Sequence, residues 1–109
     1  MATAIKGDIQ EEIQRIKQVL VEKYKPQKII LFGSAARGEF DPQKSDLDFF
    51  VIKNDKRNIH DRMVTLYRLV KKQTPADFLV YTPQELQTRV KLGDPFILSI
   101  IEEGKVLYG

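Results

Sequence analysis

Residues 46–52 constrain the fold more than any other segment of this chain, because they are apolar on both faces of a predicted strand. Alternation along a strand puts three apolar side chains on one face: Leu47, Phe49 and Val51. Phe50 and Ile52 lie on the opposite face and are also apolar. A strand of this kind has to be covered on both sides. We therefore expect one apolar face of this strand to pack against a helix layer and the other face to be covered as well.

The rest of the chain supplies helices and further strands. Helical spacing predicts helices over 8–24, where Pro26 ends the pattern, and over 60–72. Two further helices are opened by a cap residue followed by proline, at Thr82-Pro83 and at Asp94-Pro95, and Gly104 ends the second. Short apolar runs predict strands over 28–32 and 77–81 and an edge strand over 106–108, and we expect a loop over 38–45.

Three aspartates lie at or near the starts of two predicted strands. Asp46 and Asp48 emerge on the same face of one strand, about 7 Å apart along the backbone, and Asp77 begins another. Carboxylates at the end of a buried strand are unfavourable unless they are paired, hydrated or bound to a cation. Two ordinary interpretations stay open: an Asp-x-Asp pair arises easily by chance, and Asp77 is a turn residue after Pro75.

A Gly-Ser turn follows the strand over 28–32. Gly33 has no side chain, so a phosphate can approach the backbone, and the Ser34 hydroxyl can donate a hydrogen bond to it. The planar guanidinium of Arg37 also suits phosphate oxygens. The alternatives are that Ser34 is an ordinary helix cap and that Arg37 is a solvated surface residue.

Composition narrows the chemistry. The chain has no cysteine and a single histidine, His60. This composition excludes thiolate chemistry and histidine-rich metal sites. A metal ion would therefore bind oxygen ligands, as Mg²⁺ and Mn²⁺ do. With 109 residues we expect one domain, 1–109. No apolar run approaches the roughly 20 residues that span a bilayer, and no signal peptide is evident, so we expect a cytoplasmic protein with no membrane partner. A net charge of +3 is too weak to indicate a nucleic-acid-binding surface.

The order of these motifs resembles a known family. The segments are Leu-Phe-Gly-Ser-Ala-Ala-Arg-Gly at 31–38 and Ser-Asp-Leu-Asp-Phe-Phe-Val at 45–51, with a third aspartate opening a later strand. They resemble the nucleotidyltransferase superfamily that includes DNA polymerase β, and in particular its minimal MNT-type members. The resemblance extends over nearly the whole chain, including the tail over 93–109.

The resemblance implies both a fold and a site. The implied fold is a small mixed β-sheet flanked by helices. Asp46 and Asp48 would bind the Mg²⁺ that coordinates the nucleotide triphosphate, and Asp77 would join a second metal position and help to activate the acceptor hydroxyl. In the same resemblance, the triphosphate is held by the turn: Gly33 and Ser34, with Arg37 assisting.

The resemblance also implies a partner. Minimal members of the family are typically antitoxins paired with a HEPN-domain ribonuclease toxin, and they transfer AMP from ATP to a tyrosine of that toxin. The competing hypothesis is an antitoxin that neutralises its partner by binding alone, without catalysis. A third, a nucleic-acid-binding module, has only the mild positive charge in its favour. We assign no role to His60, Tyr67 or Tyr81.

Overall fold

The computed structural model describes residues 2–71 and 74–109, with the side chains of the first helix described from Ile9 onward. In chain order the elements are α1 (Ala2–Lys23), β1 (Lys28–Phe32), the short 3₁₀-helix η1 (Gly33–Ala35), β2 (Leu47–Ile52), α2 (Ile59–Leu69), β3 (Ala76–Tyr81), α3 (Pro83–Lys91), α4 (Pro95–Glu103) and β4 (Lys105–Tyr108). Every predicted helix and strand is thus present.

The strands of the described residues form one mixed sheet in the order β3-β2-β1-β4. β1 is antiparallel to both of its neighbours, β2 and β4, whereas β2 and β3 run parallel. The crossover from β2 to β3 carries α2, as a parallel connection requires. The mixed α/β fold with a small mixed sheet is therefore confirmed.

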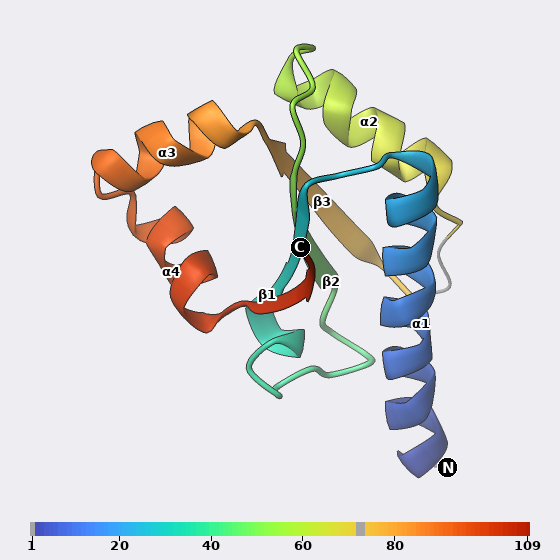
Figure 1. Cartoon of the computed structure of the whole chain (residues 1–109). Helices are drawn as coiled ribbons and strands as arrows, with labels where there is room; N and C mark the ends of the chain where they lie inside the picture. Colours follow the sequence, from blue (N-terminus) through green and yellow to red (C-terminus); the bar gives the residue numbers. More distant parts are fainter. Residues whose placement is uncertain (1, 72–73) are drawn as a thin grey trace.

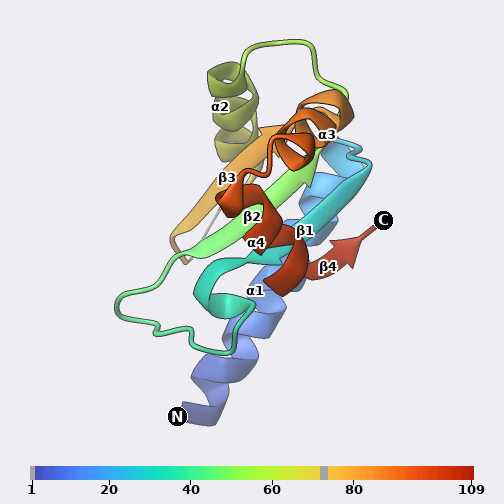
Figure 2. The ribbon, with the colours of Figure 1, turned by 90° about the vertical axis from the view of Figure 1, so that its left-hand side faces the viewer.

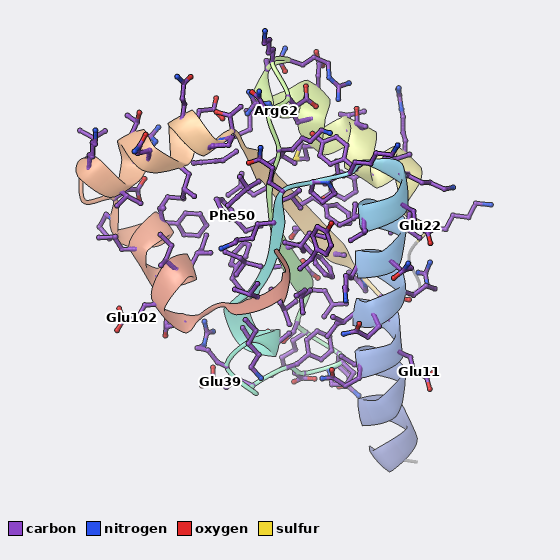
Figure 3. All side chains as sticks on the ribbon, in the orientation of Figure 1. Glu11, Glu22, Glu39, Phe50, Arg62 and Glu102 are labelled. Carbon is purple, nitrogen blue, oxygen red and sulfur yellow. The ribbon has the colours of Figure 1, made fainter. Side chains whose placement is uncertain are left out.

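The sheet separates two apolar layers (Figure 1). On one face α1 and α2 pack against a cluster that includes Phe49. On the other face α4 packs against a smaller cluster that contains Phe50, and Figure 3 shows Phe50 between the sheet and this helix. Both phenylalanines are fully buried. The prediction that β2 is covered on both faces is confirmed. Because β2 lies between β3 and β1, its first residues lie in the middle of one end of the sheet.

The predicted helix caps are also present. Thr82 and Glu85 form a complete capping box at the start of α3. The Asp94 side chain accepts hydrogen bonds from two backbone N–H groups of α4, and that helix ends at Gly104. None of the described helices is both long enough and apolar enough to cross a bilayer.

Element boundaries differ from the predicted ones by a few residues. α1 begins at Ala2 rather than near residue 8. α2 begins at Ile59 because Asn58 caps it by accepting from the backbone N–H of Asp61, and it ends at Leu69. The predicted end of this helix, at residue 72, lies outside the described residues. β2 begins one residue later than expected, at Leu47, so Asp46 directly precedes the strand.

Candidate active site

The turn after β1 is shaped around a carboxylate of the neighbouring strand. Gly33 has a φ of +75°, in the left-handed region that side chains disfavour. A Cβ added to Gly33 would collide with Oδ2 of Asp48. The Gly33 carbonyl accepts hydrogen bonds from the N–H groups of Ala36 and Arg37, at 3.1 and 3.2 Å, which closes the turn. A glycine is therefore required here, and it brings bare backbone against the Asp48 carboxylate.

Ser34 lies inside this turn rather than at its cap. The cap position of η1 is Phe32, and no side chain caps this short helix. The Ser34 carbonyl accepts from the N–H of Glu39 at 2.8 Å, so the backbone of the turn is held by its own hydrogen bonds. The interpretation of Ser34 as a helix cap is wrong. Its half-buried side chain is left for another role beside Gly33.

The parallel pairing of β2 with β3 brings the aspartates together. Asp48 and Asp77 are direct partners in the register of these strands, so their backbones are about 4.8 Å apart. Both side chains lie on the face that carries Phe50, since residues two apart on a strand share a face. Asp46 precedes β2 by one residue and is exposed. All three predicted carboxylates therefore lie at the sheet end where Gly33 follows β1, and Asp48 is the one that Gly33 contacts.

The electrostatics of this cluster are unfavourable for a carboxylate. The pKa of Asp48 is raised to about 6, mainly by burial and then by the negative charges of Asp77 and Asp46, while Arg37 opposes the shift. No ion pair is formed by Asp48 with any described residue. A carboxylate in this position is destabilised when it is ionised, and a bound cation would remove that penalty.

The donor set fits a hard divalent cation in part. Only carboxylate oxygens are present, which suits Mg²⁺ or Mn²⁺. Among the described residues no three acidic or histidine side chains converge closely enough to hold a metal ion by themselves. Mg²⁺ is usually held by one or two carboxylates together with phosphate oxygens of the substrate rather than by a complete protein cage. The arrangement therefore suits a metal that arrives with a nucleotide.

Arg37 lies at the rim of the site. Its Nε donates to Oε1 of Glu39 at 3.0 Å, and both side chains are exposed. The pKa of Arg37 is raised mainly by this hydrogen bond, and the charges of Glu103 and Asp48 add to it. An exposed pair of this kind is weak. The position supports both the predicted phosphate contact and the solvated alternative, because the guanidinium is near Asp48 but bound to Glu39.

Comparison with known proteins establishes the family. Residues 13–108 match the sequence model of the nucleotidyltransferase domain. The chain belongs to the nucleotidyltransferase family.

Individual relatives agree with this assignment. "Putative protein adenylyltransferase MJ1379" of Methanocaldococcus jannaschii is 31% identical to this nucleotidyltransferase over 99 residues, and the match covers 89% of this chain and 91% of the relative. MJ1217, which has the same description and comes from the same organism, is 28% identical over 97 residues with the same coverage. A solved structure described as a "putative nucleotidyltransferase" from Sulfolobus solfataricus has the same fold, with a TM-score of 0.52 and 24% identity over 73% of this chain and 78% of that one.

Tyr67, to which the sequence assigned no role, contacts one of the three predicted carboxylates. From α2 its hydroxyl donates to Oδ1 of Asp77 at 2.7 Å, and its ring packs edge-on against Phe78 at 5.3 Å between centroids. Burial, followed by the hydrogen bond to Asp77, raises the pKa of Tyr67 to about 12. No sequence signal links Tyr67 to Asp77.

A cleft of about 960 Å³ lies at the opposite end of the sheet from the carboxylates. Its walls come from the start of α3, from the segment after β2 and from the end of α3, including Lys56, Thr82 and Arg89. None of the three predicted aspartates lines it. The cleft has no carboxylate cluster, and the one acidic residue in its lining, Glu85, is paired with Arg62. It therefore lacks the metal ligands that the sequence predicts.

Proposed function

We propose that the protein is a Mg²⁺-dependent nucleotidyltransferase that transfers AMP from ATP to a hydroxyl group of a partner protein. Mn²⁺ would serve in the same oxygen-lined position. Asp46 and Asp48 would hold the metal that binds the triphosphate, and Asp77 would join a second metal position. Gly33 and Ser34 would bind the triphosphate. We expect this reaction in the cytoplasm.

The observation that carries the proposal is the contact between Gly33 and Asp48. A glycine in a left-handed conformation lies against a carboxylate that is partly buried and close to two further carboxylates, Asp77 and Asp46. This arrangement weakens the fold at that point, so packing does not explain it. It does place a phosphate-accessible backbone next to a cation-seeking side chain, which is the combination that a metal–triphosphate complex needs.

The chemistry follows from that placement. The acceptor oxygen attacks the α-phosphorus of ATP, a P–O bond forms, and the bond from the α-phosphorus to the bridging oxygen breaks to release pyrophosphate. The acceptor proton would pass to Asp77, whose Oδ1 is already held by Tyr67. When bound, the metal supplies positive charge for the oxygens that become more negative in the transition state. Arg37 would leave its weak pair with Glu39 to contact a phosphate.

Two lines of support favour a protein acceptor. The Methanocaldococcus jannaschii relatives are described as protein adenylyltransferases, and the chain matches 91% of their length. The resemblance of residues 31–38 and 45–51 to minimal MNT-type proteins further favours a tyrosine of a cognate HEPN ribonuclease toxin as the acceptor, which would make this protein an antitoxin.

The second candidate is an antitoxin that neutralises its partner by contact alone. It is favoured by exposed apolar side chains on the outer surface of α4 and on β4: Leu98, Ile101, Val106 and Tyr108. A surface of this kind would also bind an acceptor protein during catalysis. The two candidates therefore differ in whether the carboxylate cluster is needed.

The test is incubation of the purified protein with Mg²⁺ and ATP labelled at the α-phosphate in a lysate of its host. The variant Asp46→Asn/Asp48→Asn removes the proposed metal ligands. Asp61→Asn is the matched control, since Asp61 is an exposed carboxylate in the first turn of α2, at the other end of the sheet. We expect a labelled protein with the wild type and with Asp61→Asn, and none with the double variant.

The outcomes separate the two candidates. Equal labelling by all three proteins would show that the aspartates are not the site. An unlabelled partner that co-purifies equally with the wild type and the double variant would favour neutralisation by binding. If a HEPN toxin is the acceptor, digestion and mass spectrometry of the labelled band would place AMP on one of its tyrosines.

A further inference from the structure

Two phenylalanine rings stand beside the carboxylates, on the same face of the sheet. Phe32, the last residue of β1, is the register partner of Asp48 and packs against the cluster that contains Phe50. The ring of Phe96, in the first turn of α4, meets that of Phe32 edge-on, with centroids 5.9 Å apart and planes at 84°. Figure 2 shows α4 in front of the sheet and next to the turn formed by η1.

Phe96 is held in place but not covered. Its backbone N–H donates to Oδ1 of Asp94 at 3.0 Å. The residue before it is Pro95, whose ring fixes the backbone φ at the start of α4. α4 buries Ile97 and Ile100 against the sheet, whereas Phe96 remains 50% exposed. An exposed apolar residue alone needs no explanation. Here a half-exposed aromatic ring contacts Phe32, the residue directly before the phosphate-binding turn that we propose.

We propose that Phe96, supported by Phe32, is the platform on which the base of the bound nucleotide stacks. The inference rests on the proposed function, because it needs the phosphates of the nucleotide to lie at Gly33 and Ser34. Phe32 is covalently joined to Gly33, so the rings lie on the side of the turn from which a base can extend while its phosphates face Asp48. Aromatic rings bind bases by stacking on their flat faces.

The platform also predicts how selective the site is. A phenyl ring has no hydrogen-bonding group, and stacking on it tolerates every base. Phe96 therefore strengthens nucleotide binding without distinguishing adenine from guanine. We expect the contribution of this ring to the affinities for ATP and for GTP to be the same within about threefold.

The test compares two ligands that share a phosphate chain, ATP and inorganic tripolyphosphate, each titrated with Mg²⁺ into the full-length protein in a calorimeter. Phe96→Ala removes the ring, Phe96→Leu keeps apolar volume without a ring, and Phe96→Tyr keeps the ring. Leu98→Ala is the control, since Leu98 is an exposed apolar residue on the same helix. Melting curves of each variant check that the fold is retained.

We expect Phe96→Ala and Phe96→Leu to bind ATP roughly tenfold more weakly and tripolyphosphate as the wild type does. Phe96→Tyr and Leu98→Ala should bind both ligands normally. The inference is overturned if Phe96→Ala binds ATP normally, even if that variant labels the acceptor protein less. It is also overturned if Phe96→Ala loses affinity for ATP and for tripolyphosphate equally. A wild type that binds neither ligand would overturn the phosphate site and the proposed function with it.

Discussion

Acidic side chains have opposite surroundings at the two ends of the sheet. At the carboxyl ends of β2 and β3, Asp55 accepts from Nε and Nη2 of Arg57, at 3.0 and 2.6 Å, and from the hydroxyl of Tyr24 at 2.7 Å. At the same end Glu85 accepts from Arg62 at 2.7 Å. At the amino ends of these strands, Asp48 faces other carboxylates instead. Figure 3 shows Arg62 at one end of the molecule and Glu39, near the turn, at the other.

The pKa values follow this difference. The Arg57 guanidinium holds the pKa of Asp55 well below its usual range, and Arg62 lowers the pKa of Glu85. Burial and the neighbouring carboxylates raise the pKa of Asp48. One end therefore stabilises the fold through its charges, while the other retains a destabilising charge. Such a charge is typical of a site that binds a ligand.

The largest effects should come from removing one carboxylate at each end. Asp48→Asn should lower AMP transfer roughly a thousandfold or more, because several kcal/mol of transition-state charge stabilisation are lost with a metal ligand. Asp55→Asn should leave transfer per folded molecule unchanged but lower the free energy of unfolding by about 2 kcal/mol, because it weakens charged hydrogen bonds. Labelling assays and urea denaturation measure the two effects.

The same pair has a sharper stability signature. Without metal at pH 7.5, Asp48→Asn should be slightly more stable than the wild type, since it removes repulsion from Asp77 and Asp46. If both variants lost stability by the same amount, the contrast between the two ends would be wrong.

Two glycines test the shape of the site end. Gly33 and Gly38 both have a φ of +75°, but only at Gly33 would a Cβ meet Asp48, and nothing lies within 4 Å of a Cβ at Gly38. Each alanine variant should lose about 1 kcal/mol of stability from backbone strain. Gly33→Ala should also lower transfer about a hundredfold by displacing the carboxylate.

Gly38→Ala is therefore a matched control for backbone conformation. Comparable transfer by the two variants would mean that the contact between Gly33 and Asp48 does not matter. Thermal unfolding of both proteins, run beside the labelling assay, separates strain from displacement.

Much of this contrast was predictable from local patterns. Alternation over 46–52 indicated a strand covered on both faces, and the Thr82 and Asp94 caps fixed where α3 and α4 begin. The Asp-x-Asp spacing placed two carboxylates on one face. These features depend on neighbours in the sequence, so a single chain reveals them. The assignment of roles to the aspartates, Gly33, Ser34 and Arg37 stays a prediction.

The remaining contacts depend on how elements pack, and sequence patterns do not encode that. The sequence left open whether Asp77 is a turn residue. The parallel pairing of β3 with β2, which puts Asp77 in register with Asp48, places it within the strand. The hydrogen bond from Tyr67 to Asp77 and the ion pair of the buried Arg62 with the exposed Glu85 each join elements far apart in sequence. Arg62 is only 4% exposed, although α2 was predicted from the spacing of its apolar residues, which gives no sign of a buried arginine.

Tyrosines provide a smaller test of the two ends. Tyr67→Phe removes the hydroxyl that holds Asp77, and we expect about a tenfold loss of metal affinity with a similar loss of transfer, as for other groups that orient metal ligands. Tyr81→Phe, at the far end of β3, is the control and should change neither. A Tyr67→Phe variant with normal Mg²⁺ dependence of transfer would show that Asp77 is positioned without it.

The smallest predicted effect is a pH dependence of opposite sign at the two ends, in protein kept free of metal with EDTA. The folded-state pKa of Asp48, about 6, lies above the ordinary aspartate value of 3.8. Its contribution to stability is therefore complete below pH 3.8 and is lost as the pH rises through 6. Because Asp48 is only half-buried, we expect about 1 kcal/mol relative to Asp48→Asn.

Asp55 should behave in the reverse sense. Its folded-state pKa is depressed, so its contribution is present above the ordinary range of an aspartate and is lost as the pH falls below that range. Between pH 7.5 and 4.5 the wild type should gain stability relative to Asp48→Asn, while its advantage over Asp55→Asn stays constant and shrinks only at lower pH. Urea denaturation of the three proteins across this range measures both differences. If both stability differences changed in the same direction with pH, the pKa values of the two carboxylates would not be shifted in opposite directions, and the contrast between the two ends would be wrong.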